Sequence, residues 1–313
     1  VTGVQTCALP ICLTPIKENS FSAFVTISRG CSNYCTYCIV PYVRGAERPH
    51  APERIINSIS ELVAEGVVEI TLLGQNVNSY RHGDLDFPGL LRRVLAETEA
   101  PRIRFMTSHP KDLSRDLVDL LADEPRLMPH IHLPLQSGSD RVLKRMGRRY
   151  TVEQYFETVD YIRERMEYVS LTTDLIVGFP SETPEDFEQT LAAVHRAQYD
   201  SAFMFRYSVR PGTVAAGFED DVPEKEKIDR LNRLIELQQS IARECNQREV
   251  GRICYSVVEG KSRRSDALWR ARTEANKTVL FESDRVAIGQ VVSVRIEAAD
   301  AFTLHGVPAR EGE

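Results

Sequence analysis

The chain has 313 residues, of which 42% are hydrophobic and 27% are charged, so it can bury one large core, or a large and a small one, and is not disordered. Its net charge of −6 gives no general attraction to nucleic acid, so any such contact must be local. Seven scattered cysteines and the lack of an apolar run of about 20 residues favour a reducing cytoplasm and no membrane segment.

The first twelve residues, VTGVQTCALPIC, lack the basic start and long apolar centre of a signal peptide. They also differ from the rest of the chain and resemble a translated sequencing adapter. We therefore expect residues 1–12 to be a non-native leader and residues 13–22 to be a linker. Cys7 and Cys12 take no part in the chemical argument for this reason.

From residue 23 onward, strand-like and helix-like runs alternate. Short runs of apolar and β-branched residues predict six strands, at residues 23–28, 67–74, 102–107, 130–135, 169–178 and 200–208. Apolar residues at helical spacing predict helices at residues 52–66, 87–98, 114–123, 139–146, 152–166, 184–197 and 223–247. Because parallel strands need crossover helices, these units predict an α/β fold with a partial (β/α)6 barrel over residues 23–246.

Three cysteines lie within eight residues in the segment RGCSNYCTYCIVPYVRG, at Cys31, Cys35 and Cys38. A buried apolar role does not suit a loop that also holds glycine, serine and asparagine. Structural zinc needs four ligands, and His50, the nearest candidate, lies twelve residues further on. A [4Fe-4S] cluster on three thiolates leaves one iron open to bind a reactant, so the spacing favours a cluster over zinc.

Other polar or glycine-containing segments also follow the predicted strands. They are GQN at residues 74–76, SHP at 108–110, QSGS at 136–139, GFPSE at 178–182 and RPGT at 210–213. The carboxyl ends of parallel strands lie at one edge of the sheet, and ligands bind there in α/β folds. We therefore expect the cysteine loop and these segments to form one site.

After residue 247 the pattern becomes all-β, with short strands predicted at residues 253–258, 278–282, 290–296 and 302–307. This predicts a small barrel over residues 247–313. A basic loop is expected between its first two strands, and its candidate RNA-binding residues are Lys261, Arg263, Arg264, Trp269, Arg270, Arg272 and Lys277. Phosphate neutralisation and base stacking would suit this composition, although a solvated charge run is the alternative.

The C-x3-C-x2-C spacing, with Tyr37 before the last cysteine, resembles the radical S-adenosylmethionine superfamily. RGCSNYCTYCIVPYVRG, TLLGQNVNSY, FMTSHPKDL, HLPLQSGSDRVLKRMGRRYT and TDLIVGFPSETPEDF resemble the methylthiotransferases, and among them the MiaB-type tRNA enzymes. GQNVNSY discriminates best between members of that family. The small barrel resembles the TRAM domain, which is associated with RNA binding, and the resemblance covers residue 21 to the end of the chain.

The resemblance implies that Cys31, Cys35 and Cys38 are the catalytic ligands of a [4Fe-4S] cluster whose open iron binds S-adenosylmethionine. It implies contacts with S-adenosylmethionine for nine further residues, namely Tyr37, Gly74, Gln75, Asn76, Ser108, Gln136, Ser137, Val177 and Gly178. Simpler roles stay open for some of them. Tyr37 could pack the loop, residues 74–76 could form a turn, and Ser137 could cap a helix.

The implied reaction adds a methylthio group to C2 of N6-isopentenyladenosine next to the anticodon of tRNA. The implied partners are tRNA and an electron donor of flavodoxin or ferredoxin type, and we expect a monomer. Family members carry an additional N-terminal domain with three further cysteines, which has no match here. We therefore expect a fragment that cleaves S-adenosylmethionine without transferring sulfur. Alternatives are a methylthiotransferase for another tRNA base or a ribosomal protein, and a zinc-stabilised RNA-binding module.

Overall fold

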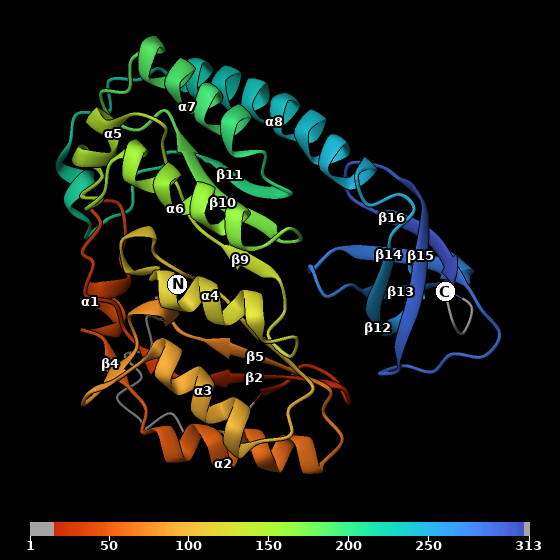
Figure 1. Ribbon diagram of the computed structural model, residues 1–313. Coiled ribbons are helices and arrows are strands. Elements are labelled where there is room, and N and C mark those ends of the chain that lie inside the picture. The colour runs from red at the N-terminus through yellow and green to blue at the C-terminus, as the bar shows by residue number, and fades with distance from the viewer. Residues whose placement is uncertain (1–15, 310–313) are drawn as a thin grey trace, which may run out of the picture.

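The computed structural model describes residues 16–309, which form a large α/β part and a small β-barrel (Figure 1). The predicted leader and the first three residues of the predicted linker lie outside the described residues. The rest of the linker includes strand β1 (Ile16–Lys17), which pairs antiparallel with β2 (Ser22–Thr26). This part of the expected linker therefore extends the sheet.

The six predicted parallel strands are present, but they form two sheets. The first has the order β1-β2-β5-β8, with β5 at Glu69–Leu73 and β8 at Arg102–Phe105. The second has the order β11-β10-β9, with β9 at His130–His132, β10 at Ser170–Val177 and β11 at Ser201–Arg206. Between β8 and β9 there is only an isolated bridge from Ile103 to Leu127. Pro129 directly before β9 has no N–H to extend the ladder, so the partial barrel is interrupted there.

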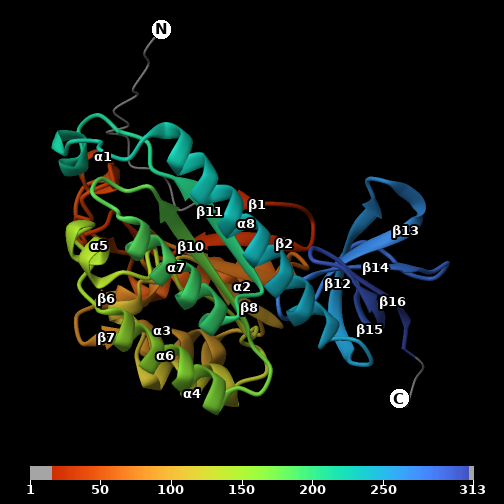
Figure 2. The same cartoon turned by 90° about the horizontal axis from the view of Figure 1, so that it is seen from above.

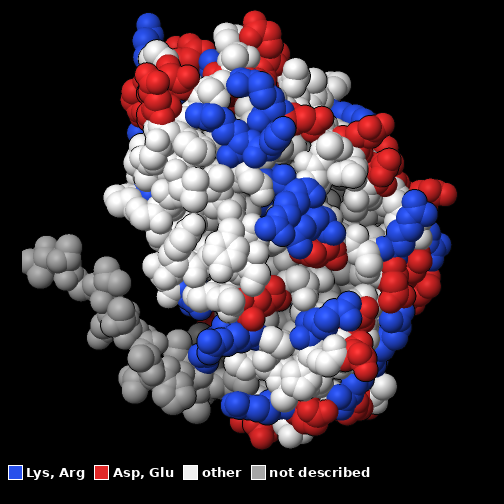
Figure 3. Space-filling view, turned by 90° about the vertical axis from the view of Figure 1, so that its left-hand side faces the viewer, with Lys and Arg blue, Asp and Glu red and all other residues white. Residues whose placement is uncertain are grey.

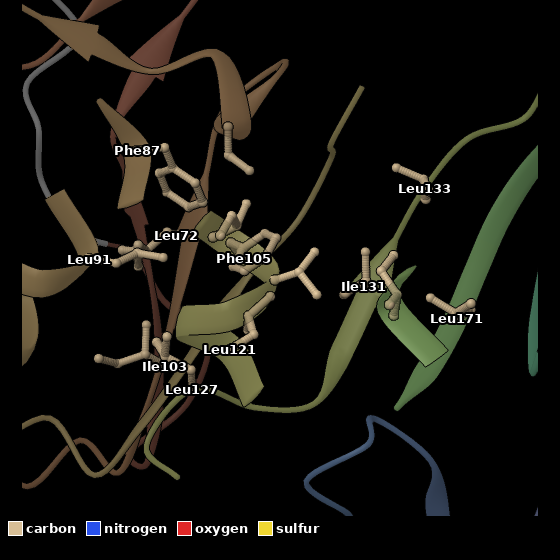
Figure 4. Close-up of a cluster of buried hydrophobic side chains, with 14 of the residues drawn as sticks. Leu72, Phe87, Leu91, Ile103, Phe105, Leu121, Leu127, Ile131, Leu133 and Leu171 are labelled. Carbon is tan, nitrogen blue, oxygen red and sulfur yellow. The ribbon is translucent and has the colours of Figure 1, made fainter. Parts of the chain in front are cut away.

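Helices cover the outer faces of the two sheets (Figures 1 and 2). The longer ones are α2 (Pro52–Ala64), α3 (Phe87–Glu97), α4 (Arg115–Asp123), α6 (Val152–Arg165), α7 (Pro184–Ala197) and α8 (Glu224–Gln247). Shorter segments are α1 (Val40–Arg44), α5 (Asp140–Arg145), η1 (Val77–Ser79), η2 (Pro110–Asp112), η3 (Val214–Gly217) and a two-stranded ribbon of β6 (Arg81–His82) and β7 (Leu85–Asp86). Their apolar faces meet the strands in one core, where Phe87 and Phe105 pack edge to face at 5.2 Å (Figure 4).

Side-chain caps fix where several helices begin. Thr151 and Thr183 form reciprocal capping boxes with Gln154 and Asp186, and Ser139 caps α5 by accepting from the Val142 N–H. Two of these caps, Ser139 and Thr183, lie only a few residues after the end of a parallel strand. The caps therefore also fix the turns that form the edge of the sheet.

The C-terminal part is a closed five-stranded barrel with the order β12-β13-β14-β16-β15. Its strands are β12 (Ile253–Ser262), β13 (Ser265–Arg272), β14 (Thr278–Glu282), β15 (Val291–Ala299) and β16 (Leu304–Pro308). The sequence analysis predicted four strands and a basic loop, and this was wrong for residues 265–272. Those residues form β13, because pairing with β12 and β14 satisfies their backbone groups while Ala271 enters the barrel core.

The small barrel packs on the amino-terminal ends of the parallel strands, through two buried arginines of β8. Arg104 donates to the carbonyls of Thr273 at 2.6 Å and Glu274 at 2.7 Å, and Arg102 donates to the carbonyl of Tyr255 at 2.9 Å. Both guanidinium groups pair with Glu69 at 3.0 Å. Burial opposes ionisation of Glu69, but Arg104 and Arg102 outweigh it and hold its pKa below the usual value. A shared charge network therefore joins the two parts.

Replacing Arg104 by Met should lower the free energy of unfolding by about 3 kcal/mol, because two carbonyls and part of a carboxylate stay buried without their donor. Urea unfolding measures the change, followed by fluorescence of Trp269, the single tryptophan, which lies in β13. Arg92→Met, at an exposed ion pair with Asp116, is the control and should cost less than about 1 kcal/mol. Equal losses in the two variants would contradict this account of the interface.

Candidate functional site

The cysteine loop follows β2 at the carboxyl edge of the first sheet. Strands β3 (Ser28–Arg29) and β4 (Arg48–Pro49) pair antiparallel and close the loop at its base. Gly30 has a φ of 72°, and a Cβ there would lie 2.3 Å from the Ala46 carbonyl oxygen. Only glycine fits this position, and it lets the Cys31 N–H bond the Gly45 carbonyl at 3.2 Å.

The three thiols of the loop are close enough to influence one another's ionisation. Cys35 is buried, whereas Cys31 and Cys38 are partly exposed. Burial raises the pKa of both Cys31 and Cys38, and the neighbouring thiols of the triplet raise it further. Three thiolates at this place therefore need positive charge beside them, which the iron ions of a cluster supply.

The thiols do not form a site for a single metal ion. Within residues 16–309, no group of three or more His, Cys, Asp or Glu side chains converges on a position that could hold one. Zinc draws all its ligands into one tetrahedral shell, whereas a [4Fe-4S] cluster takes each thiolate on a different iron. Three thiols in one loop leave a zinc ion one ligand short, whereas a cluster can keep one iron without a protein ligand.

A second segment holds the loop in place. Thr36 donates from its N–H to the Met146 carbonyl at 2.9 Å and from its hydroxyl to the Arg145 carbonyl at 3.0 Å. These carbonyls belong to the last turn of α5, where helix ends leave acceptors free. On the other side, the Thr36 carbonyl accepts from the Ala215 N–H at 2.8 Å. The residue between two of the cysteines is thus fixed by two distant parts of the chain.

Tyr37 packs its ring under the loop. It meets Phe179 edge to face at 6.4 Å and lies against the small apolar cluster that also contains Tyr207. Burial raises the pKa of Tyr37 well above its usual value, so the phenol stays neutral. Packing is therefore a role that Tyr37 has in this structure, beside the contact with S-adenosylmethionine that the resemblance implies.

Residues 74–76 and Ser108 follow β5 and β8 and leave buried polar atoms unpaired. A Cβ on Gly74 would lie 2.6 Å from the Ser28 hydroxyl, so the backbone is closely approached there. Asn76 donates to Asp112 at 2.7 Å, while Gln75 is half-buried. The described residues offer no partner to three buried atoms at these strand ends, namely Ser28 Oγ, Asn76 Oδ1 and Ser108 Oγ. Such atoms are the groups that a polar ligand would satisfy.

Gln136 and Ser137 follow β9 and are largely bound to neighbouring segments. Gln136 has a φ of 70°, its N–H donates to the Asp174 carbonyl at 2.8 Å, and its carbonyl accepts from Ile176 at 2.9 Å. The Ser137 hydroxyl accepts from the Ser139 N–H at 3.2 Å and lies 3.4 Å from the Thr190 hydroxyl. Ser137 is not the cap of α5, which is Ser139, but its hydroxyl holds the N–H of that capping residue.

Val177 and Gly178 end β10 beneath the same edge. The Val177 carbonyl accepts from Tyr207 at 2.8 Å, and the Gly178 N–H donates to the Glu182 carboxylate at 2.7 Å. Gly178 has a φ of 67°, which favours glycine. Glu182 is buried and pairs with Arg230 of α8 at 2.7 Å, a pair that the sequence analysis missed because its partners are 48 residues apart.

Arg148 is a second residue that the sequence analysis missed. It is buried beside the cysteine loop, whereas its neighbour Arg149, which the sequence places at the same edge, is exposed. No local pattern tells which of two adjacent arginines turns inward. His109, also near this edge, is kept neutral because burial, with Arg148 contributing, lowers its pKa to about 2.

The seven candidate RNA-binding residues divide into two groups. Arg263 and Arg264 are exposed in the turn between β12 and β13, and Lys261 lies over the Trp269 ring at 4.0 Å. The other three already have carboxylate partners, since Arg270 and Arg272 pair with Glu259 and Lys277 pairs with Asp200 and Glu249. The exposed turn is therefore the part of the set that is available to an anionic partner.

The face that carries the cysteine loop and α1 has Lys and Arg in several patches around a broad uncharged area (Figure 3). The net charge of −6 alone would suggest an acidic surface, but this face also carries patches of Lys and Arg. In the part of the chain that the structure describes, no helix is both long and apolar enough to cross a bilayer.

Comparisons with known proteins agree with these features. The Radical SAM superfamily model matches residues 25–194, just over half of the chain, and the TRAM domain model matches residues 247–309. The solved structure of the radical S-adenosylmethionine methyltransferase TsrM from Kitasatospora setae aligns with a TM-score of 0.52 at 19% identity, covering 61% of this chain and 38% of that one. Coproporphyrinogen III oxidase from Escherichia coli aligns at 0.50 and 18%, covering 71% and 58%. These structures support the fold of the large part.

Closer relatives are named tRNA-2-methylthio-N(6)-dimethylallyladenosine synthase. The protein from Clostridium botulinum (strain Loch Maree / Type A3) is 49% identical over 93% of this chain and 65% of its own length. Those from Carboxydothermus hydrogenoformans and Bacteroides thetaiotaomicron are 48% and 49% identical, over 68% and 65% of their lengths. The chain thus spans about two thirds of the length of these relatives. With both domains matched in this order, the chain belongs to the radical S-adenosylmethionine superfamily and, within it, to the MiaB-type tRNA methylthiotransferases.

Proposed function

We propose that this chain acts in the methylthiolation of tRNA, at C2 of the N6-isopentenyladenosine next to the anticodon. The observation that carries the proposal is the cysteine triplet at the carboxyl edge of a partial barrel, in a chain 49% identical to synthases named for this product. The named product favours this substrate over another tRNA base or a ribosomal protein. The chain's family implies S-adenosylmethionine and a [4Fe-4S] cluster as the cofactors.

Cys31, Cys35 and Cys38 would hold the cluster, because they are the close thiols of the loop and their ionisation needs added positive charge. When bound, the cluster supplies one electron that cleaves S-adenosylmethionine to methionine and a 5′-deoxyadenosyl radical. The chain's own residues keep the loop rigid through Thr36 and shield its underside from water with Tyr37. An external donor of flavodoxin or ferredoxin type would supply the electron.

The unpaired buried atoms at the strand ends would bind S-adenosylmethionine. Asn76 Oδ1 is an acceptor suited to the methionine ammonium group, and Ser108 Oγ can donate to a carboxylate or a ribose oxygen. Gly74 leaves room for the unpaired Ser28 hydroxyl, which lies against its backbone beside these atoms. Gln75, Gln136, Ser137, Val177 and Gly178 line the same edge and would complete the site, the last two through backbone groups that already have one partner each.

The exposed turn of the small barrel would bind the tRNA backbone. Arg263 and Arg264 are free to neutralise phosphates, and the Lys261 and Trp269 pair offers a charge and an aromatic ring beside them. Arg270, Arg272 and Lys277 would contribute only by exchanging their carboxylate partners for phosphate. A cytoplasmic monomer suits a tRNA substrate and reduced thiols.

Replacing Cys31 by Ala should abolish reductive cleavage of S-adenosylmethionine, because the cluster loses a ligand. The test is anaerobic reconstitution, with about four irons and four sulfides expected per chain, followed by measurement of 5′-deoxyadenosine. Cys245→Ala is the matched control, since Cys245 lies on the buried face of α8 and burial raises its pKa to about 11. Wild-type cleavage by the Cys31 variant would show that the triplet does not hold the cluster.

Replacing Arg263 and Arg264 together by Glu should weaken tRNA binding and flatten its dependence on salt. Two lost phosphate contacts should reduce the slope of log affinity against log salt by about 1.4 to 1.8. Binding is measured at several salt concentrations. Arg233→Glu with Arg243→Glu, on exposed positions of α8, makes the same change of net charge and should leave the slope unchanged. If the slope of log affinity against log salt is the same in the two double variants, Arg263 and Arg264 do not contact phosphate and the turn is only a solvated run of charges.

A further inference from the structure

Arg148 is a buried cation to which the proposed function assigns no role. It lies in the turn between α5 and α6 and is 9% exposed. Its guanidinium donates to the Tyr150 hydroxyl at 3.0 Å, to the Pro134 carbonyl at 3.1 Å and to the Cys35 sulfur at 3.4 Å. Among the described residues, none of its hydrogen-bond partners is a carboxylate.

A buried charge is costly unless an opposite charge lies beside it. The Pro134 carbonyl is a neutral dipole, and burial raises the pKa of Tyr150 to about 12, so that phenol is neutral at physiological pH. Cys35 is the remaining partner, and its sulfur would carry negative charge as a ligand of the bound cluster. A thiolate at Cys35 would therefore supply the negative charge that the buried guanidinium of Arg148 otherwise lacks.

The backbone around Arg148 fixes its direction. Gly147 has a φ of 73° and ends the helical turn, while the Arg148 N–H bonds the Leu143 carbonyl at 2.9 Å. The preceding Met146 carbonyl holds Thr36 of the cysteine loop. The guanidinium carbon also lies 5.1 Å from the centre of the Tyr150 ring. The arginine and the loop thus share one rigid support, which keeps the contact with Cys35 in place.

We propose that Arg148 is a positioning residue that donates a hydrogen bond to the Cys35 thiolate of the bound cluster and raises the reduction potential of that cluster. The proposal rests on the proposed function, because it requires Cys35 to be a ligand. Reduction by a flavodoxin- or ferredoxin-type donor adds one electron, breaks no bond, and makes the cluster with its thiolates more negative by one charge. A fixed positive charge beside a ligand sulfur favours that more negative state.

Other charges near the thiols do not have the same effect. Arg210 also acts on Cys38, but it is exposed, so water screens it. Arg149 follows Arg148 directly and is exposed as well. Arg148 alone combines burial with a direct bond to a sulfur of the triplet among the arginines that the structure describes.

The test is a potentiometric titration of the reconstituted cluster, followed by electron paramagnetic resonance. Arg148→Gln should lower the equilibrium constant of one-electron reduction about tenfold, which corresponds to about 59 mV for a one-electron couple. Arg148→Lys keeps the charge but loses the fork of hydrogen bonds, so its potential should fall less. Arg149→Gln is the matched control and should keep the wild-type potential.

Wild-type potentials in both Arg148 variants, at full iron and sulfide content, would overturn the proposal and assign Arg148 a packing role. If Arg148→Gln fails to hold a cluster, the potentials of Arg148→Lys and Tyr150→Phe are measured instead. Tyr150→Phe removes the hydroxyl that accepts from the Arg148 Nε and so loosens the guanidinium. A lowered potential in these two supports the proposal, and an unchanged one overturns it. Failure of the wild-type chain itself to bind iron and sulfide, measured before any titration, would instead overturn the cluster assignment on which the proposal depends.

Discussion

The gathering of three thiols in one short, partly buried loop is the constraint on which the site depends. Burial raises the pKa of Cys31 and Cys38, and a neighbouring thiol of the loop raises it further. The chain therefore needs positive charge at this place and a rigid frame that keeps the sulfurs from moving apart. In the proposed function a cluster would supply the positive charge and Arg148 would add to it, while the last turn of α5 provides the frame through its bonds to Thr36.

The parallel strands determine where everything else lies. Their carboxyl ends carry the cysteine loop and the unpaired polar atoms, while their amino-terminal ends carry Arg102, Arg104 and the small barrel. Figure 1 shows the two regions on opposite sides of the large part. Under the proposed function, a tRNA bound at both regions would have to extend across the molecule, with its backbone at the β12–β13 turn and its modified base at the strand ends.

Periodicity in the sequence was sufficient to predict the six parallel strands, their helices and the edge at which the cysteine loop lies. It failed where contacts distant in the sequence decide the outcome. Residues 265–272 carry enough basic residues to suggest a loop, but two neighbouring strands supply their hydrogen bonds. Lys277 suggested an RNA contact, yet it pairs with Asp200, which lies 77 residues earlier in the large α/β part. Arg148 turns inward because of the backbone at Gly147 and of packing. The sequence shows only two adjacent arginines and does not tell which of them is buried.

The central claim is that three thiolates of this chain hold a cluster with one iron open to S-adenosylmethionine. A Mössbauer spectrum of the protein reconstituted with ⁵⁷Fe, recorded with and without S-adenosylmethionine, tests it most directly. One iron of about four should change its isomer shift and quadrupole splitting when S-adenosylmethionine binds, while the other three keep theirs. A spectrum of four equivalent irons that S-adenosylmethionine leaves unchanged would contradict the claim.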